Sequence, residues 1–453
     1  MPDVCQEYDV VVAGGGVAGI AAACSAGRLG ARTTLVERYG FLGGMATAGL
    51  VNPFMSHKSA TGEPLIAGFF EELRGRLAAL DGIRENSFDA EALKYTAQEI
   101  AIESGVDLRL HSWVSDVRMN SDTISSLAVQ TKSGPVEVAA CVYVDTTGDG
   151  DVAALAGAPF EKGRREDGAT QAMTLKFDLG GVDLRAALEW AKEHPGQLRF
   201  PKIGPDDSID RMLEGVVSVA GYYDLVREAR AKGDLTAPGE LVFFISRPRR
   251  GEVVVNTTHI GMVDGTRSED LTRAEIEGRR QMMSLVGFFR KYVPGFESCY
   301  LARSATQVGV RETRRITGEY VFSAEDVEAA RKFPDAIARL AYPVDVHSPK
   351  GEGYTRLEER GRVVAPPPGD WYEIPYRCLL PLGVRNLLIA GKCVSSTHEG
   401  HGAIRVMPSC MAMGQAAGTA AAIAARAHAS PKEINVAELL EVLRRNGALV
   451  GDG

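Results

Sequence analysis

Paired cysteines are missing from this sequence. Its seven cysteines are scattered singly and contain no C-x-x-C pair, which argues against a disulfide framework, a zinc ribbon or a dithiol redox centre. A signal-peptide layout is also missing from the N-terminus, and no apolar run approaches the ~18 residues that would span a bilayer. We therefore expect a cytoplasmic protein with no membrane insertion and no metal site.

An excess of positive charge is absent as well. Lysine and arginine total 51 against 59 aspartates and glutamates, which gives a formal net charge of −8. This balance excludes the basic footprint of a nucleic-acid-binding protein. Hydrophobic residues make up 45% and charged residues 24% of the 453 residues, as in an ordinary globular protein of two or about three domains. Such a chain can enclose a ligand of nucleotide size.

A glycine-rich turn follows the first predicted strand. The strand covers residues 8–13, and the segment Gly14-Gly-Gly-Val17-Ala18-Gly19 then opens an alanine-rich helix. Glycines at this G-x-G-x-x-G spacing allow a tight turn, a close approach of pyrophosphate to the backbone, and close packing of helix on strand. Glu37 ends the next predicted strand 18 residues after Gly19 (37 − 19), where a carboxylate can accept hydrogen bonds from ribose hydroxyls. The unit predicts a parallel sheet that binds a dinucleotide.

Four later segments favour a dinucleotide longer than NAD. A glycine-rich loop follows Glu37 directly and contains Gly43-Gly44-Met45-Ala-Thr47. A predicted buried strand ends in the turn Thr147-Gly148-Asp149, and another ends at Gly391. A helix rich in small residues begins near Ser409. We expect one α/β domain built from both ends of the chain, with a second domain inserted between them.

Taken in order, these segments resemble the FAD-dependent oxidoreductases of the glutathione-reductase-like, two-dinucleotide-domain fold. More narrowly, they are similar to a bacterial family marked by G-G-x-x-T and R-x-[ST]-R-R-I-x-G-E-Y, here residues 43–47 and 311–320. The resemblance implies a Rossmann-like FAD-binding domain over residues 1–155 and 375–453, and an α+β substrate or cap domain over 156–374. It implies non-covalent FAD, a redox reaction at the flavin, and a helix near Ser409 directed at the flavin N1–C2=O edge. The cofactor-binding residues expected on this basis are Gly14, Gly16, Val17, Ala18, Gly19, Glu37, Arg38, Gly43, Gly44, Met45, Thr47, Val114, Thr147, Gly148, Asp149, Gly391, Met407 and Ser409.

Candidate catalytic residues lie just before that helix and in the arginine-rich segment. His398 and His401 can act as base or donor, and the guanidinium groups of Arg311 and Arg314 can hold a carboxylate or oxyanion. Arg303, Arg315 and Arg405 belong to the same group of candidates. The alternative is structural: isolated histidines without a catalytic role, and arginines on a solvated helix face or in ion pairs with Glu312 and Glu319. The i, i+3 histidines lack the remaining ligands of a metal site.

The sequence thus predicts an FAD-dependent oxidoreductase that transfers hydride between a small organic substrate and flavin N5, as a dehydrogenase, an oxidase or a reductase. The alternatives are a flavin monooxygenase and a non-catalytic flavin-binding subunit or electron-transfer module. A second dinucleotide fingerprint and a C-x-x-x-x-C dithiol are both absent, which argues against a disulfide reductase. The electron partner, the substrate and a homo-oligomeric state stay open.

Overall fold

The computed structural model describes residues 7–350 and 363–451. Its centre is a parallel five-stranded sheet with the order β20-β9-β1-β2-β5. The strands are β1 (Tyr8–Ala13), β2 (Thr33–Val36), β5 (Asp107–Arg109), β9 (Ala140–Asp145) and β20 (Leu387–Ile389). β1 and β9 lie side by side although more than 120 residues separate them in sequence, and β20 joins from the C-terminal part of the chain. The predicted α/β fold is confirmed.

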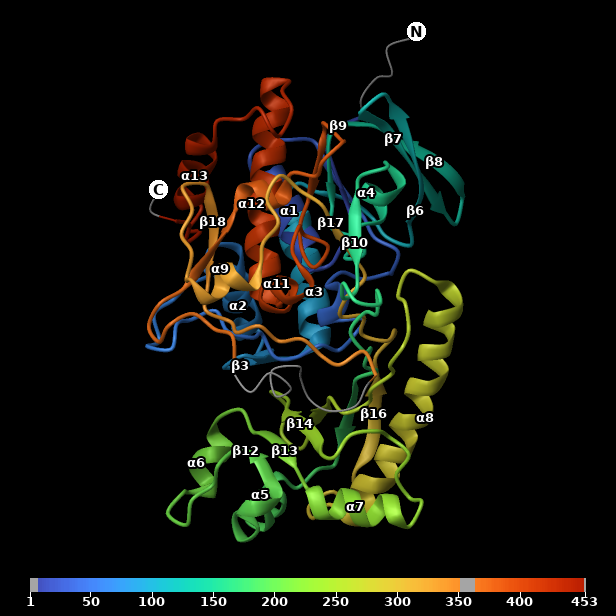
Figure 1. Ribbon diagram of the computed structural model, residues 1–453, viewed down its shortest axis with the longest axis vertical. Helices are drawn as coiled ribbons and strands as arrows, with labels where there is room; N and C mark the ends of the chain where they lie inside the picture. The colour runs from blue at the N-terminus through green and yellow to red at the C-terminus, as the bar shows by residue number, and fades with distance from the viewer. Residues whose placement is uncertain (1–6, 351–362, 452–453) are drawn as a thin grey trace.

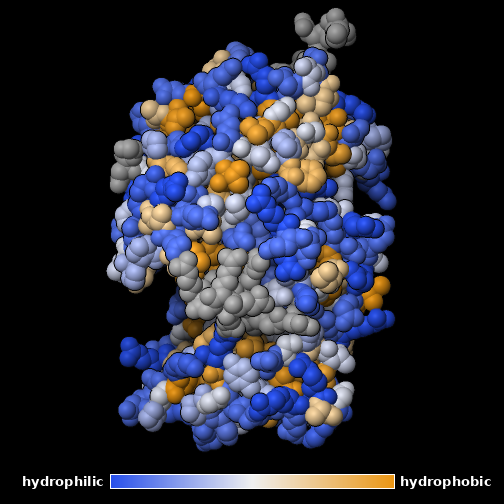
Figure 2. All heavy atoms as spheres, viewed as in Figure 1, coloured by the Kyte–Doolittle hydropathy of each residue, from blue (hydrophilic) through white to orange (hydrophobic). Residues whose placement is uncertain are grey.

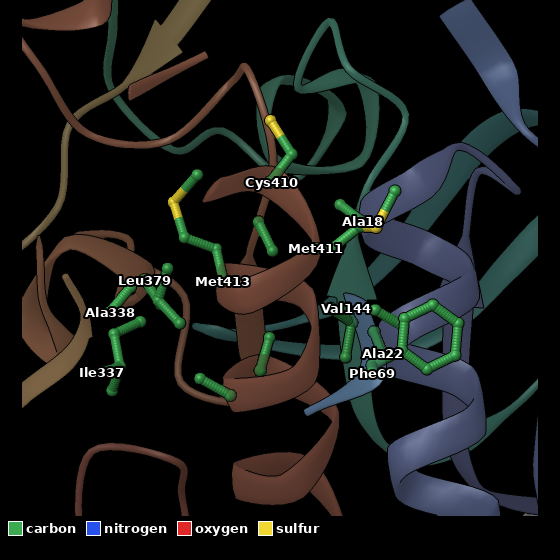
Figure 3. Close-up of a cluster of buried hydrophobic side chains, with 14 of the residues drawn as sticks. Ala18, Ala22, Phe69, Val144, Ile337, Ala338, Leu379, Cys410, Met411 and Met413 are labelled. Carbon is green, nitrogen blue, oxygen red and sulfur yellow. The ribbon is translucent and has the colours of Figure 1, made fainter. Parts of the chain in front are cut away.

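Two helices of small residues pack against each other beside this sheet (Figure 1). They are α1 (Val17–Arg28) and α12 (Met407–Ala427). A Cβ atom on Gly414 would lie 2.1 Å from the Ala18 carbonyl oxygen, and one on Gly418 would lie 1.9 Å from that of Ala22. The two backbones therefore touch, and glycine is required at both contacts. In Figure 3, Met411 lies on the side of α12 that faces Ala18.

The parallel sheet, α1 and α12 belong to the upper lobe of the molecule in Figure 1, which contains several further elements. The antiparallel strands β6 (Trp113–Asn120), β7 (Thr123–Thr131) and β8 (Gly134–Val138) form one separate sheet. The smaller strand pairs are β3 (Ile83–Arg84) with β4 (Ser87–Phe88), β10 (Phe160–Lys162) with β17 (Arg314–Ile316), and β18 (Ala336–Leu340) with β19 (Tyr372–Pro375). The other helices are η1 (Gly44–Ala46), α2 (Phe69–Ala79), α3 (Ala90–Glu103), α4 (Asp151–Leu155), α9 (Ala324–Glu328), η3 (Tyr376–Leu379), α11 (His398–Ile404) and α13 (Val436–Arg445).

The lower lobe is built on a six-stranded sheet with the order β12-β13-β14-β15-β11-β16, in which every pair is antiparallel (Figure 1). Its strands are β11 (Phe177–Gly180), β12 (Leu198–Phe200), β13 (Ser218–Gly221), β14 (Val242–Ser246), β15 (Val253–Val255) and β16 (Tyr300–Ser304). Its helices are α5 (Leu184–Glu193), η2 (Pro195–Gln197), α6 (Ile209–Glu214), α7 (Tyr223–Ala231) and α8 (Ser268–Tyr292). The visible surface of both lobes is largely hydrophilic, with scattered apolar side chains (Figure 2).

Each lobe has a hydrophobic core of its own. Apolar residues from Leu175 to Ala305 form the core of the antiparallel sheet, together with Leu50 and Ala90. Apolar residues between Phe322 and Val346 instead pack in the core beside the parallel sheet, although they lie inside the predicted insert 156–374. The division of the chain at residues 155 and 375 stays a prediction.

A buried ion-pair network joins the lower sheet to the N-terminal part of the chain. The Asp178 carboxylate accepts hydrogen bonds from Arg247 Nη2 at 2.8 Å and Arg303 Nε at 2.6 Å. Arg247 also donates to the Phe88 carbonyl oxygen at 3.0 Å, just before α3. The side chains of Asp178 and Arg247 are 0% and 1% exposed. Because both charges are removed from water, each depends on the other for compensation.

Candidate functional site

The predicted glycine turn has the geometry that phosphate binding requires. Gly14 has φ +101°, and a Cβ on Gly19 would lie 1.8 Å from the Gly14 carbonyl oxygen. Gly16 is the N-cap of α1 and offers no side chain to satisfy the first N–H groups of the helix. The nearest atom to a Cβ on Gly16 is 3.9 Å away, the Cα of Gly44. The turn is therefore closely packed at Gly14 and Gly19 and open at Gly16, where the first N–H groups of α1 can bind an anion.

The loop after Glu37 packs directly on this turn. Gly43 donates from its backbone N–H to the Gly15 carbonyl oxygen at 2.8 Å, and Gly43 has φ +112°. A Cβ on Gly44 would lie 2.8 Å from Gly16 Cα. Thr47 holds the loop by donating its hydroxyl to the Leu42 carbonyl oxygen at 2.8 Å. The two glycine segments that the sequence singled out are thus in contact.

A cleft opens beside the turn. Its lining comes from the ends of β1, β2 and β9 and from the start of β6, and consists of Gly14, Val36, Glu37, Arg38, Ser112, Trp113, Val114, Thr147 and Asp151. Glu37 is buried and accepts hydrogen bonds from the N–H groups of Gly15 at 2.6 Å and Tyr39 at 2.9 Å. Burial raises the pKa of Glu37 despite these two hydrogen bonds. An open glycine cradle, a carboxylate and an apolar wall fit the adenosine and pyrophosphate of a dinucleotide.

The turn after β9 is held by charged groups from three segments. Asp149 pairs with Lys392 Nζ at 2.5 Å and accepts the Thr313 hydroxyl at 2.7 Å. The charge of Lys392 lowers the pKa of Asp149 although burial alone would raise it. Arg314 donates to the Asp149 carbonyl oxygen at 3.0 Å and to Asp151 at 2.8 Å. Arg314 therefore holds the turn at Gly148 in place, and none of these contacts involves His398 or His401.

A second group of buried polar residues lies around α11. His398 Nδ1 is 2.8 Å from Glu312 Oε1, and Arg315 pairs with the same carboxylate. Burial opposes ionisation of Glu312, but the His398 hydrogen bond and the charge of Arg315 help to lower its pKa to about 2. An ionised Glu312 accepts the Nδ1–H of His398, so that Nε2 of a neutral His398 carries a lone pair. Among residues 7–350 and 363–451, that Nε2 has no partner.

His401 lies one turn further along α11 and is 0% exposed. Burial lowers its pKa well below the ordinary histidine value, and neither ring nitrogen has a partner within the described part of the chain. The segment then passes through Arg405 into α12, where Met407 is the first residue. Ser409 is buried, and its hydroxyl lies 2.6 Å from the Ile404 carbonyl oxygen. A structural role for Ser409 therefore accompanies any role near a ligand.

Arg311 and Arg303 make the following contacts in other parts of the chain. Arg311 donates from Nη1 to the Ala172 carbonyl oxygen, and its charge acts on Lys176, His259 and His347. Arg303 belongs to the Asp178 network of the lower lobe. Sequence reasoning missed Lys176, Asp345, His347 and Lys392, and treated Glu312 only as an ion-pair candidate. For Lys392 a signal was available, since it directly follows the strand-end glycine Gly391.

No helix within residues 7–350 and 363–451 is long and apolar enough to cross a membrane. In the same ranges no group of three or more histidine, cysteine, aspartate or glutamate side chains could hold a metal ion.

Comparison with solved structures returns many flavoproteins at low identity. One is a geranylgeranyl bacteriochlorophyll reductase-like protein from Thermoplasma acidophilum, with 12% identity, 97% of this chain and 83% of that chain covered, and a TM-score of 0.47. A triple mutant of the flavin-dependent brominase Bmp2 has 12% identity, coverage of 97% and 84%, and a TM-score of 0.46. The anhydrotetracycline hydroxylase OxyS from Streptomyces rimosus has 14% identity, coverage of 96% and 64%, and a TM-score of 0.43.

No curated protein matches this chain. The model of one protein family, described as FAD dependent oxidoreductase, matches residues 9–443. That match includes the glycine turn, the cleft and the buried histidines, and it extends over both lobes. The chain therefore belongs to the FAD dependent oxidoreductase family, and it is an enzyme whose cofactor is FAD.

Proposed function

We propose that this enzyme transfers hydride between a small organic substrate and N5 of FAD, as a dehydrogenase, an oxidase or a reductase. FAD, when bound, supplies the ring that exchanges the hydride. The buried Glu312–His398 pair carries the proposal, because oxidation or reduction of an organic molecule by hydride also requires transfer of a proton. We also propose that the chain belongs to the subgroup marked by the motifs at residues 43–47 and 311–320.

The cofactor would be held along one continuous path. We assign the adenosine half to the cleft, with Glu37 accepting from the ribose hydroxyls and Val114 beside the adenine. The pyrophosphate is assigned to the N–H groups at Gly16 and the start of α1. The flavin end is assigned to the loop at Gly43 and Gly44 and to the first turn of α12, where helix N–H groups stabilise negative charge.

His398 is suited to accept a proton from a substrate. Glu312 is ionised and fixes the tautomer of the His398 imidazole, as a hydrogen-bonded carboxylate commonly does for a histidine base. The lone pair of Nε2 is buried and is not used by the described residues, so no hydrogen bond within the protein competes for it. Arg315, 3% exposed, pairs with Glu312 and keeps it charged. His401 is a second buried histidine that can exchange a proton. The planar guanidinium group of Arg311 can hold a carbonyl or carboxylate oxygen of the substrate.

The ribose assignment can be tested at one side chain. Replacing Glu37 with alanine should weaken FAD binding by about 1.5–3 kcal/mol, the value of a hydrogen bond to a charged group. The measurement is the dissociation constant of FAD for protein stripped of flavin. Glu63→Ala serves as control, because Glu63 is an exposed carboxylate outside the cleft. An unchanged dissociation constant in the Glu37 variant would place the ribose elsewhere.

Thiol chemistry should play no part in the reaction. Cys393 follows the end of β20, is fully buried, and has a pKa raised well above the ordinary thiol value by burial. Thiolates rather than thiols react, so Cys393→Ser should leave substrate-driven flavin reduction within about twofold of wild type. Stopped-flow absorbance measures this rate. Loss of reduction in a variant that keeps its FAD would contradict the proposed mechanism.

The decisive experiment for the proposed function is a metabolite screen of the FAD-loaded enzyme without oxygen. A substrate that donates hydride should bleach the oxidised flavin band, and a reductase should reoxidise chemically reduced flavin with its substrate. NAD(P)H oxidation that accelerates with an organic molecule and yields an oxygenated product would instead establish a monooxygenase. Bound FAD with no response in any arm would favour a non-catalytic flavin subunit. The same screen, repeated with oxygen and quinones, identifies the electron partner.

A further inference from the structure

Lys176 is a buried lysine whose charge has no carboxylate partner among the described residues. It immediately precedes β11, and the residue is 6% exposed. Its Nζ donates to the Asn52 carbonyl oxygen at 3.3 Å. An ammonium group has three donors, and no second hydrogen bond to Nζ is formed within residues 7–350 and 363–451. Asn52 continues the loop that begins at Gly43, so Lys176 lies where the lower lobe meets the proposed flavin loop.

Two further cations, Arg311 and Arg405, are near enough for their charges to act on Lys176. Arg311 donates to the Ala172 carbonyl oxygen. Gln171 accepts from the His347 N–H at 3.1 Å, and two residues before His347 the Asp345 carboxylate accepts from Arg405 Nη2 at 3.3 Å. We call Lys176, Arg311 and Arg405 the cationic cluster.

The carboxylates near this cluster are already engaged. The Asp178 carboxylate accepts hydrogen bonds from both Arg247 and Arg303. The Asp345 carboxylate pairs with Arg405, and its Oδ1 lies 3.6 Å from His347 Nε2. Burial lowers the pKa values of His259 and His347 to about 3 and about 4, helped by the charge of Arg311. Both histidines are therefore neutral at pH 7. Asp178 and Asp345 are thus occupied by arginines, and Lys176 is left without a carboxylate partner among the described residues.

Unused hydrogen-bond donors lie beside the cationic cluster. Gln171 is 1% exposed, and its Nε2 has no partner among the described residues. The same holds for Arg405 Nε. Buried donors without acceptors are costly unless a ligand supplies the acceptors. The unmatched groups here are N–H donors, so they call for a ligand rich in acceptor oxygens.

We infer that the cationic cluster binds the carboxylate group of the substrate, and that the substrate of this enzyme is a small organic acid. This inference rests on the proposed function, because it treats the space beside the flavin loop as the substrate site. A carboxylate matches the planar fork of Arg311 and supplies a counter-charge to Lys176. A buried ammonium is stabilised when such a counter-charge arrives.

The inference predicts a defined pH dependence. Burial lowers the pKa of Lys176 to about 7, and the charges of Arg311, Arg247 and Arg405 act in the same direction while Asp178 opposes them. A bound carboxylate favours the charged ammonium and must raise this pKa. Affinity for the anion is therefore full below pH 7 and falls by up to about tenfold per pH unit above it. The arginines do not titrate in this range.

The test is equilibrium binding of succinate to the oxidised, FAD-loaded enzyme by titration calorimetry between pH 6 and 9. Succinate should bind, its neutral diamide should not, and affinity should fall as pH rises. Lys176→Met should weaken binding at pH 6 by roughly 10–100-fold. Lys176→Arg should bind succinate with no pH dependence, and Arg311→Lys should bind more weakly than wild type. Lys202→Met, which removes an exposed lysine of the same lobe, should change nothing.

Each contrary result overturns the inference. These are the absence of succinate binding, equal binding in Lys176→Met, unchanged pH dependence in Lys176→Arg, or preference for inorganic phosphate, which would indicate a phosphorylated substrate. Flavin content and circular dichroism of each variant show that the protein measured is folded and loaded. Since binding needs no turnover, failure here leaves the flavin-bleaching test of the proposed function unaffected.

Discussion

Replacing His401 with alanine should slow substrate-driven reduction of the flavin by roughly 10²–10⁴-fold, the usual contribution of a positioned proton-transfer group. His401 is fully buried on α11, and both ring nitrogens are unpartnered within the described residues. Burial lowers its pKa well below the ordinary value, so the ring is neutral, with one nitrogen that donates a hydrogen bond and one that accepts. The measurement is stopped-flow reduction without oxygen, once the screen has supplied a substrate.

The control for this prediction is His428→Ala, which removes an exposed histidine at the C-terminal end of α12. FAD affinity should be unchanged in both variants. A merely structural His401 would lower thermal stability but leave the pH profile of reduction in place. Reduction at the wild-type rate in His401→Ala would remove this residue from the reaction and leave His398 as the base.

Replacing Asp178 with asparagine should lower the free energy of unfolding by about 3–5 kcal/mol, the cost of breaking a buried ion pair at one partner. The change leaves Arg247 with a buried charge and removes the 2.6 Å contact to Arg303. Urea-induced unfolding of the FAD-loaded enzyme, followed by circular dichroism, measures the effect. Because Arg247 also reaches the Phe88 carbonyl oxygen, the variant should loosen the contact between the lobes as well as the lower sheet.

The exposed pair Arg185–Asp210 in the same lobe supplies the matched control. Its side chains are 48% and 78% exposed, and surface pairs contribute about 0–1 kcal/mol. Asp210→Asn should therefore have little effect. If Asp178→Asn costs no more than Asp210→Asn, the buried network is not what holds the lower sheet in place.

The beginning of the chain was predictable because its signals are local. β1 has the predicted bounds, and the glycine turn, α1 and β2 follow at their expected places, since each depends on neighbours in sequence. The start of β11 (Phe177–Gly180) depends on distant partners instead. Just before it, Met173 and Thr174 form isolated bridges to Ile260 and Gly309, partners that no local pattern can reveal.

The polar sites were only partly predictable for the same reason. Glu312 and His398 are 86 residues apart in sequence, and their hydrogen bond exists because β17 and α11 meet in three dimensions. Lys176 lies within an apolar strand-like run, where lysine ordinarily points to solvent. Its burial follows from the lower lobe closing over the loop at Asn52. The assignment of cofactor residues and the roles of Arg311 and the histidines stay predictions until a ligand is bound.

The contact of α1 with α12 through Gly414 and Gly418 limits how this protein can change in evolution. The two helices begin at opposite ends of the proposed cofactor path, and they are packed backbone to backbone, so neither can shift without the other. A new substrate therefore cannot be accommodated by moving the first turn of α12. Selection would act instead on the lower lobe, which has a core of its own, and on side chains such as Lys176 that it contributes. The framework would be inherited unchanged while the recognition surface diverges.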